Sequence, residues 1–302
     1  MTGVPQLPQK RGDTHGVIVA RDGTPLYYET WGSGPVLVLN GALLWDPEAW
    51  RAFIAQFSRR YRVVRWDYRG HGRSGDPQNA LRPFELDLFI RDLEAVLNHL
   101  RVDHGTMIGF GFGVQVALEA YRLIQDRINA LVLLAGSFES ALRADDQRRW
   151  FPVGIKWLIE ASVDFPHAVK LFWQIATRSP ITTLAPFFVG ANRRFLGRTQ
   201  MAAYVRHLQR MNPVFVGQLV MAMLRNTAWN LLPTISIPTL VVAGENDGIA
   251  TQEVTRAMAE RIPGSQFSVL PRVMHAVLIE QPELLNLIIE KFLVERVASA
   301  IS

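Results

Sequence analysis

The sequence predicts an α/β fold in which a mostly parallel sheet is covered by helices on both faces. Three observations predict it. A hairpin pattern opens the chain, runs of four or more apolar residues follow, and stretches with helical spacing separate those runs. Apolar runs without alternation are typical of strands buried on both faces, and strands separated by helices form parallel sheets.

Hydrophobic periodicity predicts the elements of the first half of the chain in order. The turn Arg21-Asp22-Gly23 joins the first two strands into a hairpin. Apolar residues at i, i+3, i+4 and i+7 from Trp50 predict the first helix, with Asp46 as its N-cap. The expected strands are 16–20, 25–30, 36–39, 62–66, 106–109 and 131–135, and the expected helices are 50–57, 86–100 and 112–123.

The alternation of strands and helices stops after residue 136. Residues 137–232 contain long helical stretches interrupted by prolines, without an obvious buried strand. Strand patterns resume at 239–243 and 266–270, and a helix over 284–294 closes the fold. The simplest interpretation is a helical insertion of residues 137–232 between two halves of one core, 16–136 and 233–302, preceded by a tail of residues 1–15.

Composition excludes several classes of protein. The chain is 49% hydrophobic and 20% charged, which is incompatible with intrinsic disorder. The absence of cysteine excludes disulfide frameworks, thiol nucleophiles and cysteine-ligated metals. No apolar run approaches the roughly 18 residues that cross a bilayer, and the N-terminal residues lack the apolar region of a signal peptide. We therefore expect a cytoplasmic protein without a transmembrane segment.

The net charge of +5 is unevenly distributed. Residues 141–232 hold 12 Lys and Arg against 4 Asp and Glu. This segment shows no zinc-ligand spacing, RNA-binding aromatic signature or helix-turn-helix pattern, so we do not expect a nucleic-acid partner. A cluster of arginines instead favours, as a hypothesis, an anionic ligand, an acidic carrier protein or an anionic membrane surface.

Three motifs carry the chemistry. The glycine-rich turn Gly109-Phe110-Gly111-Phe112-Gly113 lies between an expected strand and an expected helix, where crowding favours residues without Cβ. Asp247 follows the strand pattern of 239–243, and His275 follows that of 266–270. A carboxylate beside a histidine Nδ1 fixes the tautomer of the ring and leaves Nε2 to face a reactant.

This order of glycine-rich turn, acid and histidine resembles the α/β-hydrolase family, over about residues 16–296. In that family the turn displays a nucleophile at the centre of Gly-x-Ser-x-Gly. Here the central residue is Gly111, so the nucleophile is absent. The resemblance implies an α/β-hydrolase fold with a helical lid over 137–232, an Asp247–His275 dyad, and an oxyanion hole made by the backbone N–H groups of Ala42 and Phe112.

Two further loops match the family only in part. Asn40-Gly41-Ala42 stands where many relatives have His-Gly. The loop from Asp67 to Ser74, Asp67-Tyr68-Arg69-Gly70-His71-Gly72-Arg73-Ser74, resembles the loop after the family's fourth strand, and we expect it to be structural. Ser74 is therefore not a credible replacement nucleophile. Ser137, just past the strand pattern of 131–135, is also not the expected nucleophile.

The insertion is rich in aromatic residues, most of which we expect in a lid core. An apolar lid over the sheet predicts an apolar cavity, and hence an acyl chain or aromatic ketide as substrate. These aromatic residues are Trp150, Trp157, Trp173, Trp229, Phe138, Phe151, Phe165, Phe172, Phe187, Phe188, Phe195 and Phe215.

Three interpretations of function remain open. In the first, the chain is a hydrolase or a hydrolase-derived lyase or transferase, in which His275 acts as a general base on water or on an apolar acyl, ester or ketide-like substrate. In the second, it is a non-catalytic pseudo-hydrolase that binds an apolar small molecule or a partner protein. In the third, Gly111 marks a nucleophile-deleted variant of an esterase-like hydrolase. None of the three calls for a cofactor or a metal.

Overall fold

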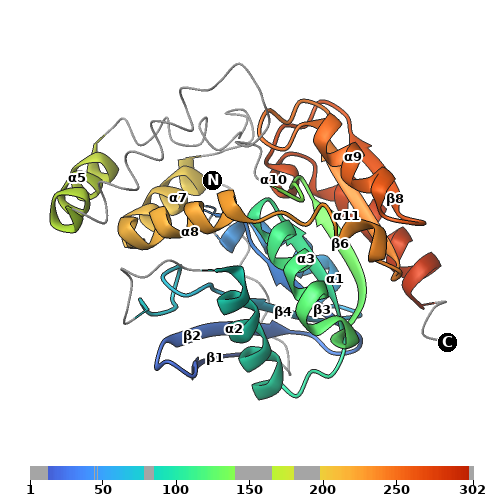
Figure 1. The fold of residues 1–302 in the computed structure, drawn as a ribbon, viewed down its shortest axis with the longest axis horizontal. Coiled ribbons are helices and arrows are strands. Elements are labelled where there is room, and N and C mark those ends of the chain that lie inside the picture. Colours follow the sequence, from blue (N-terminus) through green and yellow to red (C-terminus); the bar gives the residue numbers. More distant parts are fainter. Residues whose placement is uncertain are drawn as a thin grey trace.

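The computed structural model describes residues 13–43, 45, 47–77, 85–139, 165–179 and 198–298. One sheet in the order β1-β2-β4-β3-β5-β6-β7-β8 forms its centre (Figure 1). β1, β2 and β4 pair antiparallel, and all pairs from β4 to β8 are parallel, which confirms the predicted mostly parallel sheet. The strands are β1 (Thr14–Val19), β2 (Pro25–Trp31), β3 (Val36–Asn40), β4 (Arg62–Trp66), β5 (Gly105–Phe110), β6 (Ile128–Leu134), β7 (Thr239–Gly244) and β8 (Gln266–Leu270).

Helices cover both faces of the sheet, as the apolar runs predicted. α1 (Arg51–Phe57) and α11 (Pro282–Phe292) pack on one face, and α2 (Leu86–His99), α3 (Phe112–Ile124) and α9 (Gln252–Arg261) pack on the other. Successive strand residues point to opposite faces, so Leu37 and Leu39 belong to the first core and Val38 to the second. The sheet therefore separates two hydrophobic cores, one on each face.

Most element boundaries lie within three residues of the predicted ones, but two helices were missed. α9 buries only Thr255, Met258 and Ala259, so it lacks the apolar stripe that reveals a helix in a sequence. α10 (Val277–Glu280) is a single turn between His275 and α11. The first helix is preceded by a 3₁₀ turn over Pro47–Trp50, and its predicted cap, Asp46, lies outside the described residues.

Three helices of the insertion are described, α5 (Pro166–Arg178), α7 (Arg198–Arg210) and α8 (Pro213–Arg225). They gather at one end of the sheet (Figure 1). Phe215 is fully buried against the loop after β4. Phe165 and Phe172 are instead 66% and 61% exposed, so the expectation of a buried aromatic core is wrong at these two positions. Predicted lid residues outside the described ranges include Trp150, Trp157, Phe151, Phe187, Phe188 and Phe195.

Among the described helices, none combines the length and apolar character needed to cross a bilayer.

Candidate active site

The glycine-rich turn between β5 and α3 is a tight elbow that requires glycine at its flanks. A Cβ on Gly109 would lie 2.3 Å from the carbonyl oxygen of Gly113, and one on Gly113 would lie 2.0 Å from that of Asn40. Both distances fall inside van der Waals contact. The predicted reason for the two glycines, crowding between strand and helix, thus agrees with the observed packing.

Gly111 at the centre of the elbow has φ +56° and ψ −115°, a backbone conformation that strains other residues. A Cβ built there would lie 3.3 Å from Nε2 of His275 and only 2.8 Å from Cβ of Ala42. The elbow therefore points at His275, but the methyl group of Ala42 occupies much of the space that a nucleophilic side chain would need.

Asp247 and His275 lie together at the ends of β7 and β8, although 28 residues separate them in the chain. Nδ1 of His275 lies 2.9 Å from Oδ2 of Asp247, and both side chains are buried. Oδ1 of Asp247 accepts the N–H groups of Ile249 at 2.8 Å and Ala250 at 3.0 Å. These two bonds hold the carboxylate in place. Because a carboxylate oxygen accepts, Nδ1 of His275 carries the proton. Nε2, on the other side of the ring, faces Gly111.

Ala42 and Phe112 lie on either side of Gly111. Phe112 is the first residue of α3, so its N–H has no acceptor within the helix. In the described part of the chain, neither the N–H of Ala42 nor that of Phe112 donates to a backbone carbonyl. The N–H groups of Ala42 and Phe112 therefore remain the candidate donors beside the elbow, and their role as an oxyanion hole stays a prediction.

The end of β4 holds the oxyanion loop, defined here as Asn40-Gly41-Ala42, through two hydrogen bonds. Nε1 of Trp66 donates to Oδ1 of Asn40 at 3.2 Å, and the hydroxyl of Tyr68 donates to the carbonyl oxygen of Gly41 at 2.9 Å. That carbonyl and the N–H of Ala42 belong to one trans peptide and point in opposite directions. Tyr68 therefore sets the direction of the Ala42 N–H.

Tyr68 is suited to this role because it remains a donor. Burial raises the pKa of its hydroxyl well above the usual value. Its ring also packs edge-on against the ring of Phe112, at 5.8 Å between centroids. One side chain thus contacts both halves of the oxyanion arrangement. Sequence reasoning missed Tyr68 and Trp66 because nothing local shows that β4 lies beside β3.

The loop from Asp67 to Ser74, which the resemblance implies to be structural, is held by buried polar contacts, although Tyr68 and His71 also line the cavity described below. Arg69 is fully buried and binds Asp92 through two hydrogen bonds of 2.6 and 2.7 Å. Oδ2 of Asp67 accepts the N–H of Arg73. Ser74 Oγ donates to the carbonyl oxygen of Asp67 and accepts the N–H of Tyr27, so its hydroxyl is engaged as both donor and acceptor.

Ser137 likewise makes a local bond, since its Oγ accepts the N–H of Glu139 at 3.2 Å. Within the described residues, no group of three His, Cys, Asp or Glu side chains has the arrangement of a metal site.

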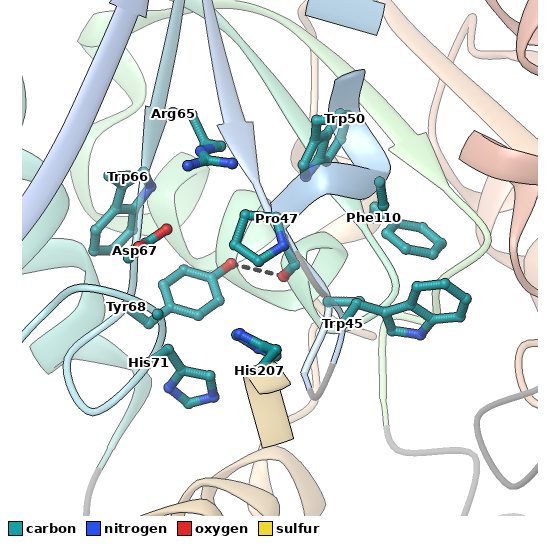
Figure 2. Close-up of a pocket in the computed structure, with 14 residues that line it drawn as sticks. Trp45, Pro47, Trp50, Arg65, Trp66, Asp67, Tyr68, His71, Phe110 and His207 are labelled. Carbon is teal, nitrogen blue, oxygen red and sulfur yellow. Dashed lines mark hydrogen bonds between the residues drawn. The ribbon is translucent and has the colours of Figure 1, made fainter. Parts of the chain in front are cut away.

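A cavity of about 40 Å³ lies between the oxyanion loop, the end of β4 and α7 (Figure 2). Its lining is mostly apolar and includes several polar side chains. Aromatic rings from Trp45, Trp50, Trp66, Tyr68 and Phe110 form one part, and Arg65, Asp67, His71 and His207 form the other. Ala42 and Phe110, which flank Gly111, also line it. The apolar substrate that the sequence analysis expects stays a prediction.

His71 is a buried histidine that resists protonation. Burial lowers the pKa of its ring to about 4, from an ordinary 6.5. Between pH 6.5 and 4 the unfolded chain binds a proton at this residue and the folded chain does not. The free energy of unfolding should therefore fall by about 3 kcal/mol as pH drops through this window. Denaturant titrations at several pH values should show the fall.

Two variants isolate the contribution of His71. His71→Gln cannot titrate, so its stability should depend less on pH than that of the wild type between pH 6.5 and 4. His104 is exposed, and His104→Gln should keep the wild-type profile. Equal pH profiles for wild type and His71→Gln would contradict the assignment.

Comparison with known proteins agrees with this fold. A family model described as the alpha/beta hydrolase fold matches residues 34–282. The 3-oxoadipate enol-lactonase 2 of Acinetobacter baylyi is 24% identical over 267 residues, which cover 88% of this chain and 91% of that protein. The pimeloyl-acyl-carrier protein methyl ester esterase of Nitrosomonas europaea is 25% identical over 267 residues, covering 85% and 95%.

A solved structure shows the same fold. The enol-lactonase from Burkholderia xenovorans aligns with a TM-score of 0.74 at 21% identity, over 93% of this chain and all of that one. Since the family model matches residues 34–282, most of the sequence, the chain belongs to the α/β-hydrolase family of enzymes.

Proposed function

We propose that this protein catalyses a hydrolase-type reaction without an acyl-enzyme, with His275 as general base and Asp247 as the residue that orients it. The observation that carries the proposal is the pair of distances at His275: 2.9 Å from Nδ1 to Asp247 and 3.3 Å from Nε2 to the β-carbon position of Gly111. A water or an acidic substrate proton near that position would lie within reach of Nε2.

The rest of the proposed mechanism uses backbone groups. The N–H groups of Ala42 and Phe112 stabilise the negative charge that develops on a carbonyl oxygen, and they need no side chain at residue 111. Because residue 111 carries no hydroxyl, the covalent route of the family is closed. Water attack or proton abstraction from the substrate remains.

We further propose an apolar acyl, ester or ketide-like substrate, with residues 137–232 as the lid over it. The support is the aromatic wall of the cavity beside Ala42, together with two relatives whose names refer to a lactone and to an acyl-carrier-protein ester. An acidic carrier protein would suit the positive charge of this segment.

Removing the base, or the carboxylate that orients it, should lower turnover sharply. His275→Gln and Asp247→Asn are expected to lower kcat/KM by about 10²- to 10⁴-fold on a panel of aryl esters and lactones, because positioned proton transfer contributes that much. The wild type should show no burst of product, and intact-mass measurement should show no covalent adduct. His104→Gln serves as the control.

The pseudo-hydrolase alternative has one observation in its favour, the Ala42 methyl group that fills the nucleophile's place. Saturable binding of these esters with no turnover above that of His275→Gln would establish the alternative and overturn the catalytic proposal.

Tyr68 should act as a positioning residue. Tyr68→Phe keeps the ring but frees the Gly41–Ala42 peptide, so kcat should fall about 3- to 10-fold with little change in KM. Tyr204 is a second buried tyrosine, and its hydroxyl makes no hydrogen bond in the described part of the chain. Tyr204→Phe should therefore leave kcat unchanged. A rise in KM alone for Tyr68→Phe would contradict the role.

A further inference from the structure

An apolar stripe on α5 is exposed to solvent. It consists of Phe165, which caps the helix, and of Leu171, Phe172 and Ile175, and these four residues are between 59% and 66% exposed. Phe172 follows Phe165 by seven residues and Ile175 follows Leu171 by four, so they share one side of the helix. A contiguous set of large exposed apolar side chains is typical of an interaction surface. We call this set the α5 stripe.

The α5 stripe is not the side by which α5 packs on its neighbours. Trp173 lies half-buried against a small core in α7 and α8, and its Nε1 donates to the carbonyl oxygen of Leu208 at 2.8 Å. Thr177, one turn further on, is buried, and its carbonyl oxygen accepts from Nε2 of Gln209 at 3.0 Å. Trp173 is one residue from Phe172 and therefore lies about 100° away around the helix. Packing within the described chain thus leaves the α5 stripe uncovered.

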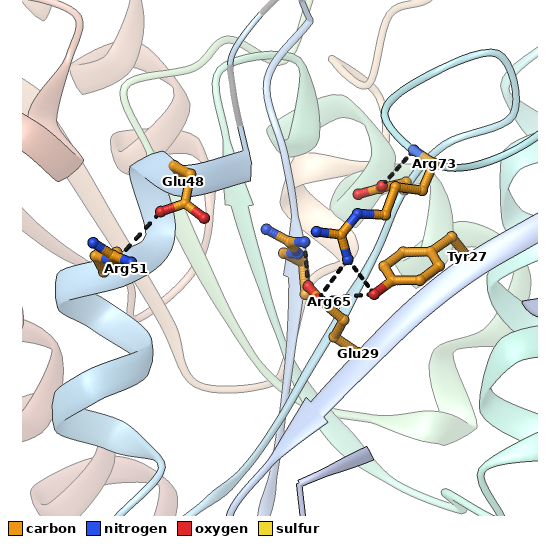
Figure 3. A network of polar contacts seen from close by, with 7 residues as sticks. Tyr27, Glu29, Glu48, Arg51, Arg65 and Arg73 are labelled. Atoms are coloured by element: carbon orange, nitrogen blue, oxygen red, sulfur yellow. Dashed lines mark hydrogen bonds and ion pairs between the residues drawn. The ribbon is translucent and has the colours of Figure 1, made fainter. Parts of the chain in front are cut away.

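The described helices of the insertion also carry positive charge without any acidic residue. α5, α7 and α8 contain no Asp or Glu. Arg65 and Arg73, by contrast, share the carboxylate of Glu29 (Figure 3). The exposed cations of the three helices have no ion pair with a carboxylate among the described residues, and they are Lys170, Arg178, Arg206, Arg210 and Arg225. Their charge is therefore available to an anionic partner.

Part of this charge borders the α5 stripe directly. Arg178 follows Ile175 by three residues and Leu171 by seven, so it lies along the edge of the stripe. Lys170 is exposed on the polar side of the same helix. α5 also lies at the outer end of the described helices of the insertion, beyond α7 and α8 (Figure 1). An amphipathic helix with bulky apolar residues on one side and basic residues on the other is typical of binding in a membrane interface.

We propose that α5 binds the surface of an anionic phospholipid bilayer, with the α5 stripe inserted at the boundary between headgroups and acyl chains and with Lys170 and Arg178 at the lipid phosphates. The cations alone would also suit an acidic protein. The stripe favours a bilayer, because a folded protein would need a groove shaped to fit it, whereas the acyl region of a bilayer accepts any exposed apolar helix face.

Sedimentation of the full-length protein with lipid vesicles tests the surface. The probes are vesicles of phosphatidylcholine alone and of an equal mixture of phosphatidylcholine and phosphatidylglycerol. Two basic side chains near an anionic surface should make binding to the mixture about 10- to 30-fold tighter than binding to phosphatidylcholine. Added salt should reduce this preference, because it screens the lipid charge.

A pair of serine substitutions tests the apolar contribution. Leu171→Ser/Phe172→Ser should weaken binding to the mixed vesicles by about tenfold or more, since it removes two side chains that would leave water on binding. The matched control is Leu284→Ser/Leu287→Ser, which replaces two exposed leucines of α11 and should bind as the wild type does. All four side chains are exposed, so thermal unfolding should remain unchanged in both variants.

A pair of glutamine substitutions tests the charge. Lys170→Gln/Arg178→Gln should lose the preference for the mixed vesicles and keep the wild-type affinity for phosphatidylcholine. Arg59 and Arg101 are exposed arginines outside the insertion. Arg59→Gln/Arg101→Gln should therefore keep the preference.

Fluorescence quenching measures whether the stripe enters the bilayer. Phe172→Trp adds an indole to the α5 stripe, and lipids brominated on their acyl chains should quench it beyond the quenching of the wild-type protein. Leu287→Trp places the indole on α11, where these lipids should add no quenching. His275→Gln should bind vesicles as the wild type does whatever its turnover, so this proposal and the proposed reaction can fail separately.

Several results would overturn the inference. They are equal binding to the two kinds of vesicle, binding that survives Leu171→Ser/Phe172→Ser, and quenching of Phe172→Trp no greater than that of the wild type. Binding to an acidic acyl carrier protein without binding to vesicles would assign the charge to a protein partner instead. Self-association in solution that Leu171→Ser/Phe172→Ser removes would assign the stripe to a second copy of this chain.

Discussion

Gly111→Ser alone should lose stability without gaining an acyl-enzyme, whereas the double variant Gly111→Ser/Ala42→Gly should gain one. The single variant forces a side chain into a backbone at φ +56°, which costs about 1–3 kcal/mol. It also brings the new Cβ to 2.8 Å from Cβ of Ala42, an overpacking of similar cost. Removing the Ala42 methyl leaves Nε2 of His275, at 3.3 Å, as the nearest group.

A double-mutant cycle measures this coupling. Denaturant unfolding of the four proteins should show that Ala42→Gly recovers part of the stability lost in Gly111→Ser, because the two residues touch. Stopped-flow assays with an activated aryl ester should show a burst only for the double variant. A full burst in Gly111→Ser alone would mean that the oxyanion loop moves aside readily. No burst in a folded double variant would mean that the site has diverged beyond its nucleophile.

Asp92→Ala should be among the most destabilising single substitutions in the core. Arg69 is fully buried, and Asp92 is its buried bidentate partner at 2.6 and 2.7 Å. Removing the carboxylate leaves a buried guanidinium without its main counter-charge, which costs about 3–5 kcal/mol. Burial raises the pKa of Asp92, and the hydrogen bonds and positive charge of Arg69 oppose this rise. The Asp92 carboxylate therefore depends on Arg69 as Arg69 depends on it. Thermal and denaturant unfolding measure the loss.

Asp22 provides the matched control, because it binds the same guanidinium from the surface. It lies 2.6 Å from Nη1 of Arg69, but its side chain is 45% exposed. Water screens such a contact, so Asp22→Ala should cost only about 0–1 kcal/mol. Similar losses for the two alanine variants would contradict the argument from burial.

Much of the fold was predictable because it depends on local patterns. The apolar runs of β4 and β8 fall at the expected residues, and the glycines of the elbow follow from crowding that any strand-to-helix turn of this kind produces. α9 was not predictable, because its buried face is short and only weakly apolar. Other strand boundaries differ from the predicted ones by a few residues. A strand extends as far as it pairs with the neighbouring strand, and that neighbour is not visible in the local sequence pattern.

Some residues of the candidate site could be predicted from the sequence and others could not. The sequence order of elbow, acid and histidine indicated Asp247 and His275, and the structure places them 2.9 Å apart. Their catalytic role stays a prediction. No sequence pattern singled out Tyr68 or Arg65, because each of them acts through a contact with another part of the chain. Their importance depends on which strand lies beside which.

The sequence by itself determined the class of fold, the position of the glycine-rich elbow and the glycine at its centre, because these depend on residue type and on periodicity along the chain. Only the tertiary structure decided that β4 lies between β2 and β3. That placement brings Tyr68 to the oxyanion loop and Arg65 and His71 to one cavity. The pairing of β3 with β5 sets the Ala42 methyl against Gly111. Such packing between distant segments, unlike periodicity, leaves no mark on any single stretch of sequence.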